Sequence, residues 1–292
     1  MLPEFVIPNS IVQILNQYLL DDEVGINEAY SSLLINAGSQ QHFSYRSDID
    51  KLRDPFHKLL NSYSIPPTTN AIDLPVMLGS SNNKLTIVVC AMDSLPPEPD
   101  SHHWAKNGIS PNDGIQLWIP FSLCEPWNSP KGSMTSNLNF FKPLIESFNV
   151  YVTDIYKLFF RILSNGIYLR SNQIQDYQNL VWSENGNIHK QILKNEIEVL
   201  KPAAIVTLGS AATHKLFDLS EAKKGISSKS TSNLIPAFQT PFGIPHYPMP
   251  HISNAANGAK ALFIKQLKIL RKNGESPNTV IANHLIHSIN NS

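Results

Sequence analysis

The segment from Lys84 to Pro96 reads K-L-T-I-V-V-C-A-M-D-S-L-P and predicts a buried strand that ends in a turn. Residues 85–90 form an almost continuous apolar run rich in β-branched side chains, which is typical of a strand covered on both faces. In open parallel α/β sheets, ligands bind beyond the carboxyl ends of the strands. Asp93 therefore lies where a ligand would bind and where a side chain could take part in a reaction. Its alternative role is an Asx-turn or a helix cap.

Three further segments predict strands that pair with this one. They are residues 149–153 (N-V-Y-V-T), residues 203–208 (A-A-I-V-T-L) and residues 244–249, where two prolines confine the strand to an edge or an irregular position. A helix with Leu193, Ile197 and Leu200 on one face ends at the Lys201-Pro202 pair. This helix, the strand that follows it, Gly209 and a further helix have the order of βαβ units, which predicts an α/β fold.

The two ends of the chain are expected to lie outside this domain. Apolar residues recur at helical spacing in the first part of the chain, which predicts a helical N-terminal extension over residues 1–80. The main domain would cover residues 81–275 and end in a helix from Ala255 to Lys272. Phe263, Leu267 and Leu270 would share one face of that helix, and Lys265, Lys268 and Lys272 the opposite face, as a binding surface or simply as a solvated surface. Residues 276–292 are expected to form a loose polar tail.

Composition excludes several classes of protein. The chain has 292 residues, of which 42% are hydrophobic and 16% charged, and its formal net charge is zero. No apolar run approaches the roughly 20 residues of a membrane span, and the N-terminus has no basic region typical of a secretion signal, so a cytoplasmic protein without a membrane partner is expected. Cys90 and Cys124 are too few for an iron–sulfur cluster or a cysteine-based zinc site. His246 and His251 have no third metal ligand beside them, so no metal or other cofactor is expected.

Polar residues follow three of the expected strands: Asp93 after the first, Asp154 after the second, and the segment His251-Ile252-Ser253-Asn254 after the last. Together with the runs V-T-D-I-Y-K (152–157) and E-I-E-V-L-K-P-A-A-I-V-T-L-G (196–209), they resemble the uracil-DNA glycosylase superfamily. Its first strand ends in G-Q-D-P-Y-H or a variant, and its last motif is H-P-S-P. The resemblance covers residues 84–272 and implies a three-layer α/β/α fold with a four-stranded, mainly parallel sheet.

The resemblance implies catalytic roles for two residues. Glycosylases extrude a nucleotide from the helix, and breaking the N-glycosidic bond leaves positive charge on the sugar and negative charge on the base. Asp93 would stabilise the sugar and orient or deprotonate the attacking water, and His251 would donate a hydrogen bond to the base. A loop histidine bonded only to backbone is the alternative for His251.

Asp154 stands where uracil-excising members have an asparagine that reads the pyrimidine. A side-chain amide can donate to the C4 carbonyl of uracil and accept from its N3 proton. A protonated carboxyl group does the reverse, which suits the amino group and bare N3 of cytosine. Burial would raise the pKa of Asp154 and favour that protonated form. Asp154 therefore predicts a cytosine-type base.

Leu95 stands where the uracil enzymes have a tyrosine that closes off carbon 5 of the ring. With leucine in place of that tyrosine, the pocket would admit a 5-substituted base, such as the glucosylated 5-hydroxymethylcytosine of some phage DNA. Anti-phage members of the superfamily excise such bases. Trp118 or Phe121 would stack on the base. Ser253 would contact a phosphate, and Lys223, Lys224 and Lys229 would supply further contacts to the DNA backbone.

The expected protein is thus a monomeric DNA glycosylase that excises a 5-modified cytosine and leaves an abasic site. Two alternatives stay open: a uracil-DNA glycosylase of base-excision repair, and a non-catalytic nucleic-acid binding module of the same fold.

Overall fold

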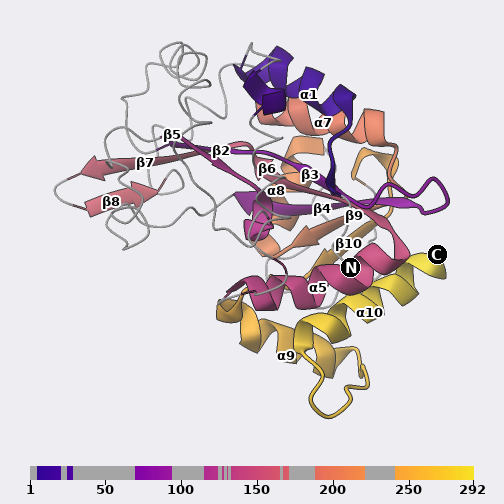
Figure 1. Cartoon of the computed structure of the whole chain (residues 1–292). Helices are drawn as coiled ribbons and strands as arrows, with labels where there is room; N and C mark the ends of the chain where they lie inside the picture. The colour runs from indigo at the N-terminus through magenta and orange to yellow at the C-terminus, as the bar shows by residue number, and fades with distance from the viewer. Residues whose placement is uncertain are drawn as a thin grey trace.

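The four expected strands lie side by side in the computed structural model. The structure describes residues 5–20, 25–28, 70–93, 115–123, 127, 130, 133–164, 167–170, 188–220 and 241–292. These are β4 (Thr86–Asp93), β6 (Asn149–Tyr156), β9 (Ala204–Leu208) and β10 (His246–Met249). They are mutually parallel, in the order β6-β4-β9-β10 (Figure 1). β10 lies at the edge of the sheet, as its proline content predicted.

The sheet is larger than the sequence indicated. β3 (Val76–Leu78) pairs antiparallel with β6, and β1 (Phe5–Val6) pairs antiparallel with β3, so the sheet has six strands in the order β1-β3-β6-β4-β9-β10. The α/β class is confirmed, whereas the expected count of four strands is wrong. The expected boundary at residue 80 passes through this sheet, because β1 and β3 come from the segment interpreted as a helical extension.

Helices lie on both sides of the sheet (Figure 1). On one side α1 (Asn9–Leu15), which continues into the π-helix η1 (Asn16–Leu20), packs on α7 (Ile188–Leu200), and α7 contacts α8 (Ser210–Ser220). On the other side α5 (Ser133–Ser147) packs on α10 (Pro277–Asn290), which also contacts α9 (Asn257–Gln266). The apolar side chains of β4 and β6 between these helices are buried, as expected for strands covered on both faces.

The helix expected over residues 255–272 is shorter in the structure. α9 ends at Gln266, and Lys268 just beyond it has a φ of 51°, a left-handed conformation that stops a helix. Leu270 is 94% exposed instead of lying on an apolar face with Phe263. The expected lysine face is therefore not continuous, because Lys268 and Lys272 lie beyond the helix.

The expected C-terminal tail is also corrected by the structure. Residues 277–290 form α10, whose Ser276 side chain accepts a hydrogen bond from the Thr279 N–H and caps the helix. Pro277 follows at the first helical position, where proline is favoured. The helix buries Val280, Ile281, Leu285 and Ile289. No helix in the described parts of the chain is long and apolar enough to cross a membrane.

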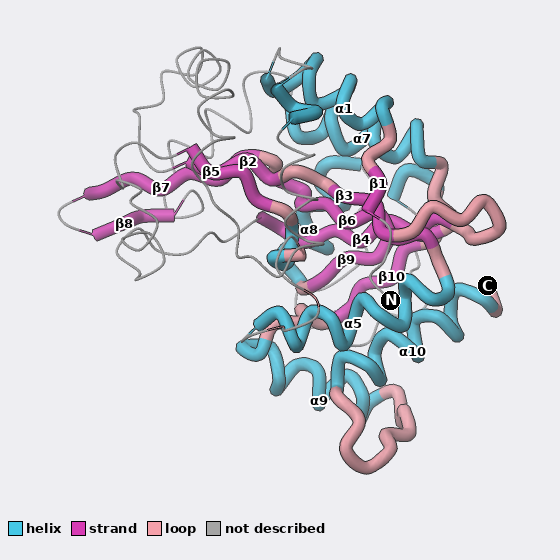
Figure 2. The backbone as a smooth tube through the Cα atoms, in the orientation of Figure 1, coloured by secondary structure: helices cyan, strands magenta, loops and turns pink. Residues whose placement is uncertain are grey.

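A second sheet starts at the carboxyl end of β6. Its strands are ordered β5-β2-β7-β8: β5 (Ile115–Trp118), β2 (Asn70–Asp73), β7 (Leu158–Ser164) and β8 (Ile167–Arg170). Only Lys157 separates β6 from β7, so the chain passes directly from one sheet into the other. β7 and β8 extend away from the helices, as both views show (Figures 1 and 2).

Candidate functional site

The carboxyl ends of the four parallel strands define the candidate site. From β4 the chain passes to β6 on one side, and it later adds β9 and β10 on the other side. The strand order therefore reverses between β4 and β9, and ligands of open α/β sheets bind at such reversals. Asp93 is the last residue of β4, Gly209 follows β9, and His251 comes two residues after β10.

His251 lies directly against the turn between β9 and α8. A Cβ added to Gly209 would lie 3.5 Å from the Cβ of His251, and Gly209 has a φ of 94°, which glycine adopts without strain. The Gly209 N–H donates to the Met249 carbonyl at 2.8 Å. The turn and the segment after β10 are thus held together at the point where the strand order reverses.

The hydrogen bonds of His251 define which of its nitrogens can donate. Its Nδ1 accepts a hydrogen bond from the Ser253 N–H at 3.1 Å. Burial, assisted by the positive charge of Lys260, lowers the pKa of the half-buried ring. A neutral imidazole that accepts at Nδ1 carries its proton on Nε2. His251 is therefore arranged as a neutral Nε2–H donor.

Phe121 lies beside His251. It belongs to the short 3-10 helix η2 (Pro120–Ser122), and its ring centroid is 6.1 Å from that of His251 and 5.4 Å from that of Phe141 in α5. Its φ of 59° is uncommon for a bulky side chain, and such conformations cluster at functional sites. The Asn137 side chain donates to the Phe121 carbonyl at 2.7 Å and helps to hold this conformation.

Asp154 is buried near the end of β6, with 2% of its surface exposed. It pairs with Ala91 of β4, and Tyr156 pairs with Asp93. Side chains alternate along a strand, so Asp154 faces away from the side on which Thr153 meets Glu196 of α7. It faces the side covered by α5, against which Phe121 packs.

A buried ion pair supports this end of β6. Lys157 Nζ lies 3.0 Å from Glu196 Oε1, donates to the Asp154 carbonyl at 2.9 Å and donates to the Thr153 hydroxyl. The Lys157 N–H donates to His189 Nδ1 at 3.1 Å. Burial raises the pKa of Glu196, and Lys157 partly opposes that shift. These contacts fix the backbone on both sides of Asp154.

Sequence reasoning missed this ion pair. Glu196 lies three residues after Leu193 and four before Leu200, so it shares the apolar face of α7. A charged residue on an apolar helix face needs a buried partner, and that was the available signal. Lys157 stood in the quoted segment 152–157, but nothing in the sequence linked it to residue 196.

Several predicted site residues lie wholly or partly outside the described structure. Leu95, Lys223, Lys224 and Lys229 are outside the described residues. Of Asp93 and Trp118 the backbone is described; Trp118 ends β5, where it pairs with Asp73 in the second sheet. Of the two residues expected to stack on a base, Phe121 lies beside His251, and the side chain of Trp118 is outside the described structure. Ser253 is half-buried, and its carbonyl accepts a hydrogen bond from Lys260 at 3.0 Å.

Within the described residues, no three His, Cys, Asp or Glu side chains gather as a metal site. His246 Nε2 instead bonds the Thr207 hydroxyl at 2.8 Å. Comparison with known protein families gives no match for this chain, and comparison with characterised proteins gives none either.

Proposed function

We propose that this protein is a DNA glycosylase that hydrolyses the N-glycosidic bond of a 5-modified cytosine and leaves an abasic site. The proposal places it among the uracil-DNA glycosylase-like folds, with helices on both sides of four parallel strands. The observation that carries it is the convergence of three strand ends: β4 ends at Asp93, Asp154 is buried near the end of β6, and His251 follows β10.

His251 and Asp93 would divide the chemistry between the two products. As the bond between the sugar and the base breaks, its electron pair leaves with the base, and positive charge develops on the sugar. The Nε2–H of neutral His251 would donate to the base oxygen on which negative charge accumulates. The Asp93 carboxylate would stabilise the sugar and take a proton from the water that attacks it.

Phe121 and Asp154 would hold the extruded base. Phe121 offers an aromatic face beside His251, on the side of the sheet toward which Asp154 points. The protonated Asp154 carboxyl would accept from the exocyclic amino group of cytosine and donate to its N3. The Lys157–Glu196 pair supports this recognition because it fixes the backbone that carries Asp154.

The preference for a 5-modified base rests on the sequence at Leu95, which lacks the planar bulk that closes off carbon 5 in uracil-excising enzymes. The DNA contacts assigned to Ser253, Lys223 and Lys224 belong to the same proposal. A role in defence against phages whose DNA carries such bases would follow from this substrate.

Replacement of the proposed carboxylate tests catalysis separately from binding. Wild-type protein, Asp93→Asn and the control Glu198→Gln, an exposed change in α7, are incubated with a duplex that contains one glucosylated 5-hydroxymethylcytosine. Alkali then cleaves the strand at abasic sites. We expect Asp93→Asn to slow base release by about 10²- to 10⁴-fold, as for the loss of a general base, and to keep its affinity for the duplex.

Other outcomes would point to a different protein. If Asp93→Asn releases the base as fast as wild type, Asp93 is not the catalytic carboxylate. Binding without base release by the wild-type protein would indicate the non-catalytic binding module, and release of uracil alone would indicate a repair glycosylase.

A further inference from the structure

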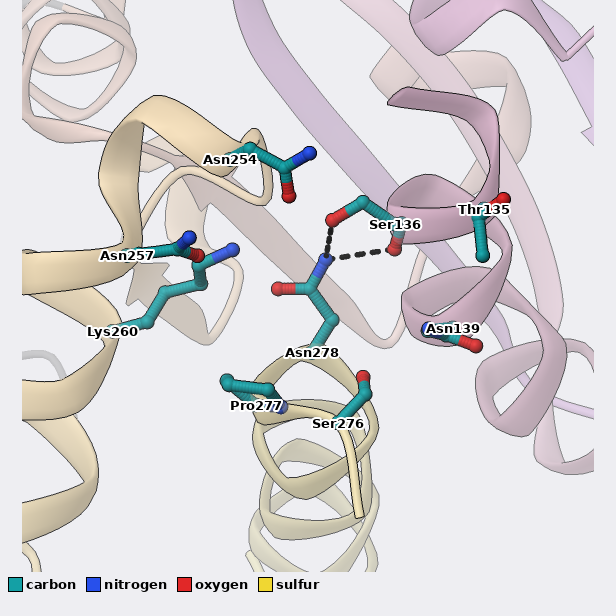
Figure 3. A pocket seen from close by; sticks show the side chains of 9 residues that line it. All are labelled: Thr135, Ser136, Asn139, Asn254, Asn257, Lys260, Ser276, Pro277 and Asn278. Carbon is teal, nitrogen blue, oxygen red and sulfur yellow. Dashed lines mark hydrogen bonds between the residues drawn. The ribbon is translucent and has the colours of Figure 1, made fainter. Parts of the chain in front are cut away.

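A polar cavity of about 390 Å³ lies behind the segment 251–254, between α5, α9 and α10 (Figure 3). Its walls carry hydroxyl and amide side chains and one cation, Lys260, and none of the residues that line it is acidic. This volume exceeds that of a bare phosphate and falls within the roughly 300–1,000 Å³ of small-molecule sites. The cavity is therefore large enough for an organic ligand, and its hydroxyl, amide and ammonium groups can bond the polar part of one.

The beginnings of three helical segments meet at this cavity. Thr135 and Ser136 belong to the first turn of α5, and Asn278 to that of α10. Asn254 begins the short 3-10 helix η5 (Asn254–Ala256), which leads directly into α9. The N–H groups at the start of a helix have no partner within it and carry partial positive charge. At α10, Ser276 already accepts the Thr279 N–H and Pro277 has no N–H, so the starts of α5 and of η5–α9 are the ones that favour an anion here.

Lys260 adds a full positive charge to the wall of the cavity. It is 2% exposed, and its ammonium donates to the carbonyls of Ile252 at 3.2 Å and Ser253 at 3.0 Å. An ammonium has three N–H groups, and these two bonds use two of them. Among the described residues no carboxylate forms an ion pair with Lys260, so an anionic ligand would supply its counter-charge.

Asn278 contributes a buried acceptor beside the cavity. Its side chain is 2% exposed, and its amide nitrogen donates to the Ser136 carbonyl at 2.7 Å, the Ser136 hydroxyl at 2.9 Å and the Ile252 carbonyl at 2.9 Å. The two N–H groups of the amide serve these three acceptors, so one N–H is shared between two of them, and together the contacts fix the orientation of the amide. Its oxygen Oδ1 has no hydrogen-bond partner among the described residues, and it points away from Ser136 toward the side of the cavity formed by Lys260 (Figure 3).

We propose that this cavity binds a phosphate monoester, carried either by the 5′ end of a DNA strand or by a free mononucleotide. The anionic oxygens meet Lys260 and the helix starts. The monoanion of a phosphate monoester, which is populated below its second pKa near 6, has a P–OH group that donates to Asn278 Oδ1. A phosphodiester within a DNA strand has no such proton. The sugar of the ester fills the remaining volume.

Calorimetric titration of the full-length protein tests this site without any modified base. The probes are a short single-stranded oligonucleotide with a 5′-phosphate, the same oligonucleotide without it, and a deoxynucleoside 5′-monophosphate. We expect both phosphorylated probes to bind and the unphosphorylated oligonucleotide to bind at least about tenfold more weakly. Tighter binding of the phosphorylated oligonucleotide than of the mononucleotide assigns the site to DNA ends, and equal binding assigns it to free nucleotides.

Two variants with the same charge change locate the binding. Asn257→Asp adds a negative charge at an exposed cavity residue in the first turn of α9, where an acidic side chain also favours the helix. Gln266→Glu adds the same charge at the exposed end of α9, away from the cavity. We expect Asn257→Asp to weaken phosphate binding by about tenfold or more and Gln266→Glu to leave it unchanged.

Three results would overturn the assignment: no binding of either phosphorylated probe, equal binding of the two oligonucleotides, or equal affinities of Asn257→Asp and wild type. None of these measurements involves base release, so the site and the proposed glycosylase activity can fail independently.

Discussion

At position 154, a single carboxyl group would determine which base the proposed pocket accepts. Asp154 is buried at the end of β6, and its backbone is held by Lys157. Asparagine has nearly the same shape, but its amide replaces the hydroxyl donor of the protonated carboxyl group. In the proposed pocket that amide would pair with the C4 carbonyl and the N3 proton of uracil, and not with the amino group and bare N3 of cytosine. We expect Asp154→Asn to reduce release of modified cytosine by about 10- to 100-fold, because a mispaired buried polar contact costs about 1–3 kcal/mol. The same variant is expected to gain release of uracil.

Comparison of initial rates on matched duplexes measures this change, with Glu198→Gln as the control for loss of one carboxylate. An unaltered ratio of cytosine to uracil release in Asp154→Asn would show that this residue does not read the base. The melting temperature of each variant distinguishes a changed pocket from a changed fold.

Buried histidines predict how stability depends on pH. Burial lowers the pKa of His246 from 6.5 to about 4 and that of His189 to about 3. Below pH 6.5 both histidines become protonated in the unfolded chain but stay neutral in the folded chain. The free energy of unfolding therefore falls as the pH decreases toward 4. From pH 7 to pH 5, His246 alone is expected to account for about 2 kcal/mol of this loss.

Urea unfolding at pH 7 and pH 5 checks the contribution of His246. In His246→Gln the side chain stays neutral at both values, so the loss between them should be smaller by about 2 kcal/mol than in wild type. An equal loss in the two proteins would mean that His246 does not stay neutral in the folded state.

At the scale of single elements, the packing of α10 can be tested through one buried side chain. Leu285 is fully buried in this helix, which packs on α5 and α9. We expect Leu285→Ala to lower the free energy of unfolding by about 2–5 kcal/mol, as is usual for a cavity in a core. Asn290→Ala, an exposed change near the end of the same helix, is the control and should have little effect. If chemical denaturation gives the same midpoint for both variants, α10 does not pack as described.

The signals for α10 were present in the sequence. Ser276 and Pro277 form a cap and a first helical residue, and Val280, Ile281 and Leu285 follow at helical spacing. The polar composition of the tail outweighed them. β1 and β3 are harder to predict, because strands of two and three residues carry too little periodicity. The early end of α9 depends on the left-handed conformation of Lys268, which no pattern indicates.

Continuous apolar runs predicted the parallel strands well. β4 and β9 lie at the expected positions, because a strand covered on both faces requires a nearly uninterrupted hydrophobic run. β6 and β10 also lie at the expected positions, although polar residues or proline interrupt their apolar residues. The approach of Phe121 to His251 depends on packing between distant segments. The sequence offered Phe121 and Trp118 as equal candidates for that position and could not choose between them.

For the whole molecule, the topology brings the proposed functional residues to one edge of the central sheet. The loops after β4, β9 and β10 begin there, and the second sheet leaves from the end of β6 (Figure 2). The cavity lies against the segment that follows β10, because Asn254 is one of its lining residues. Base recognition and phosphate binding would thus share the segment 251–254 as their common wall.

Base release from four duplexes that differ in one nucleotide tests the central proposal most directly. The variable base is uracil, cytosine, 5-hydroxymethylcytosine or its glucosylated form, and alkaline cleavage reports abasic sites. We predict that cleavage is confined to the modified cytosines, because in the proposed pocket Asp154 would select the cytosine edge and Leu95 would leave carbon 5 open. Cleavage at uracil alone, or at none of the four bases, would contradict the proposed function.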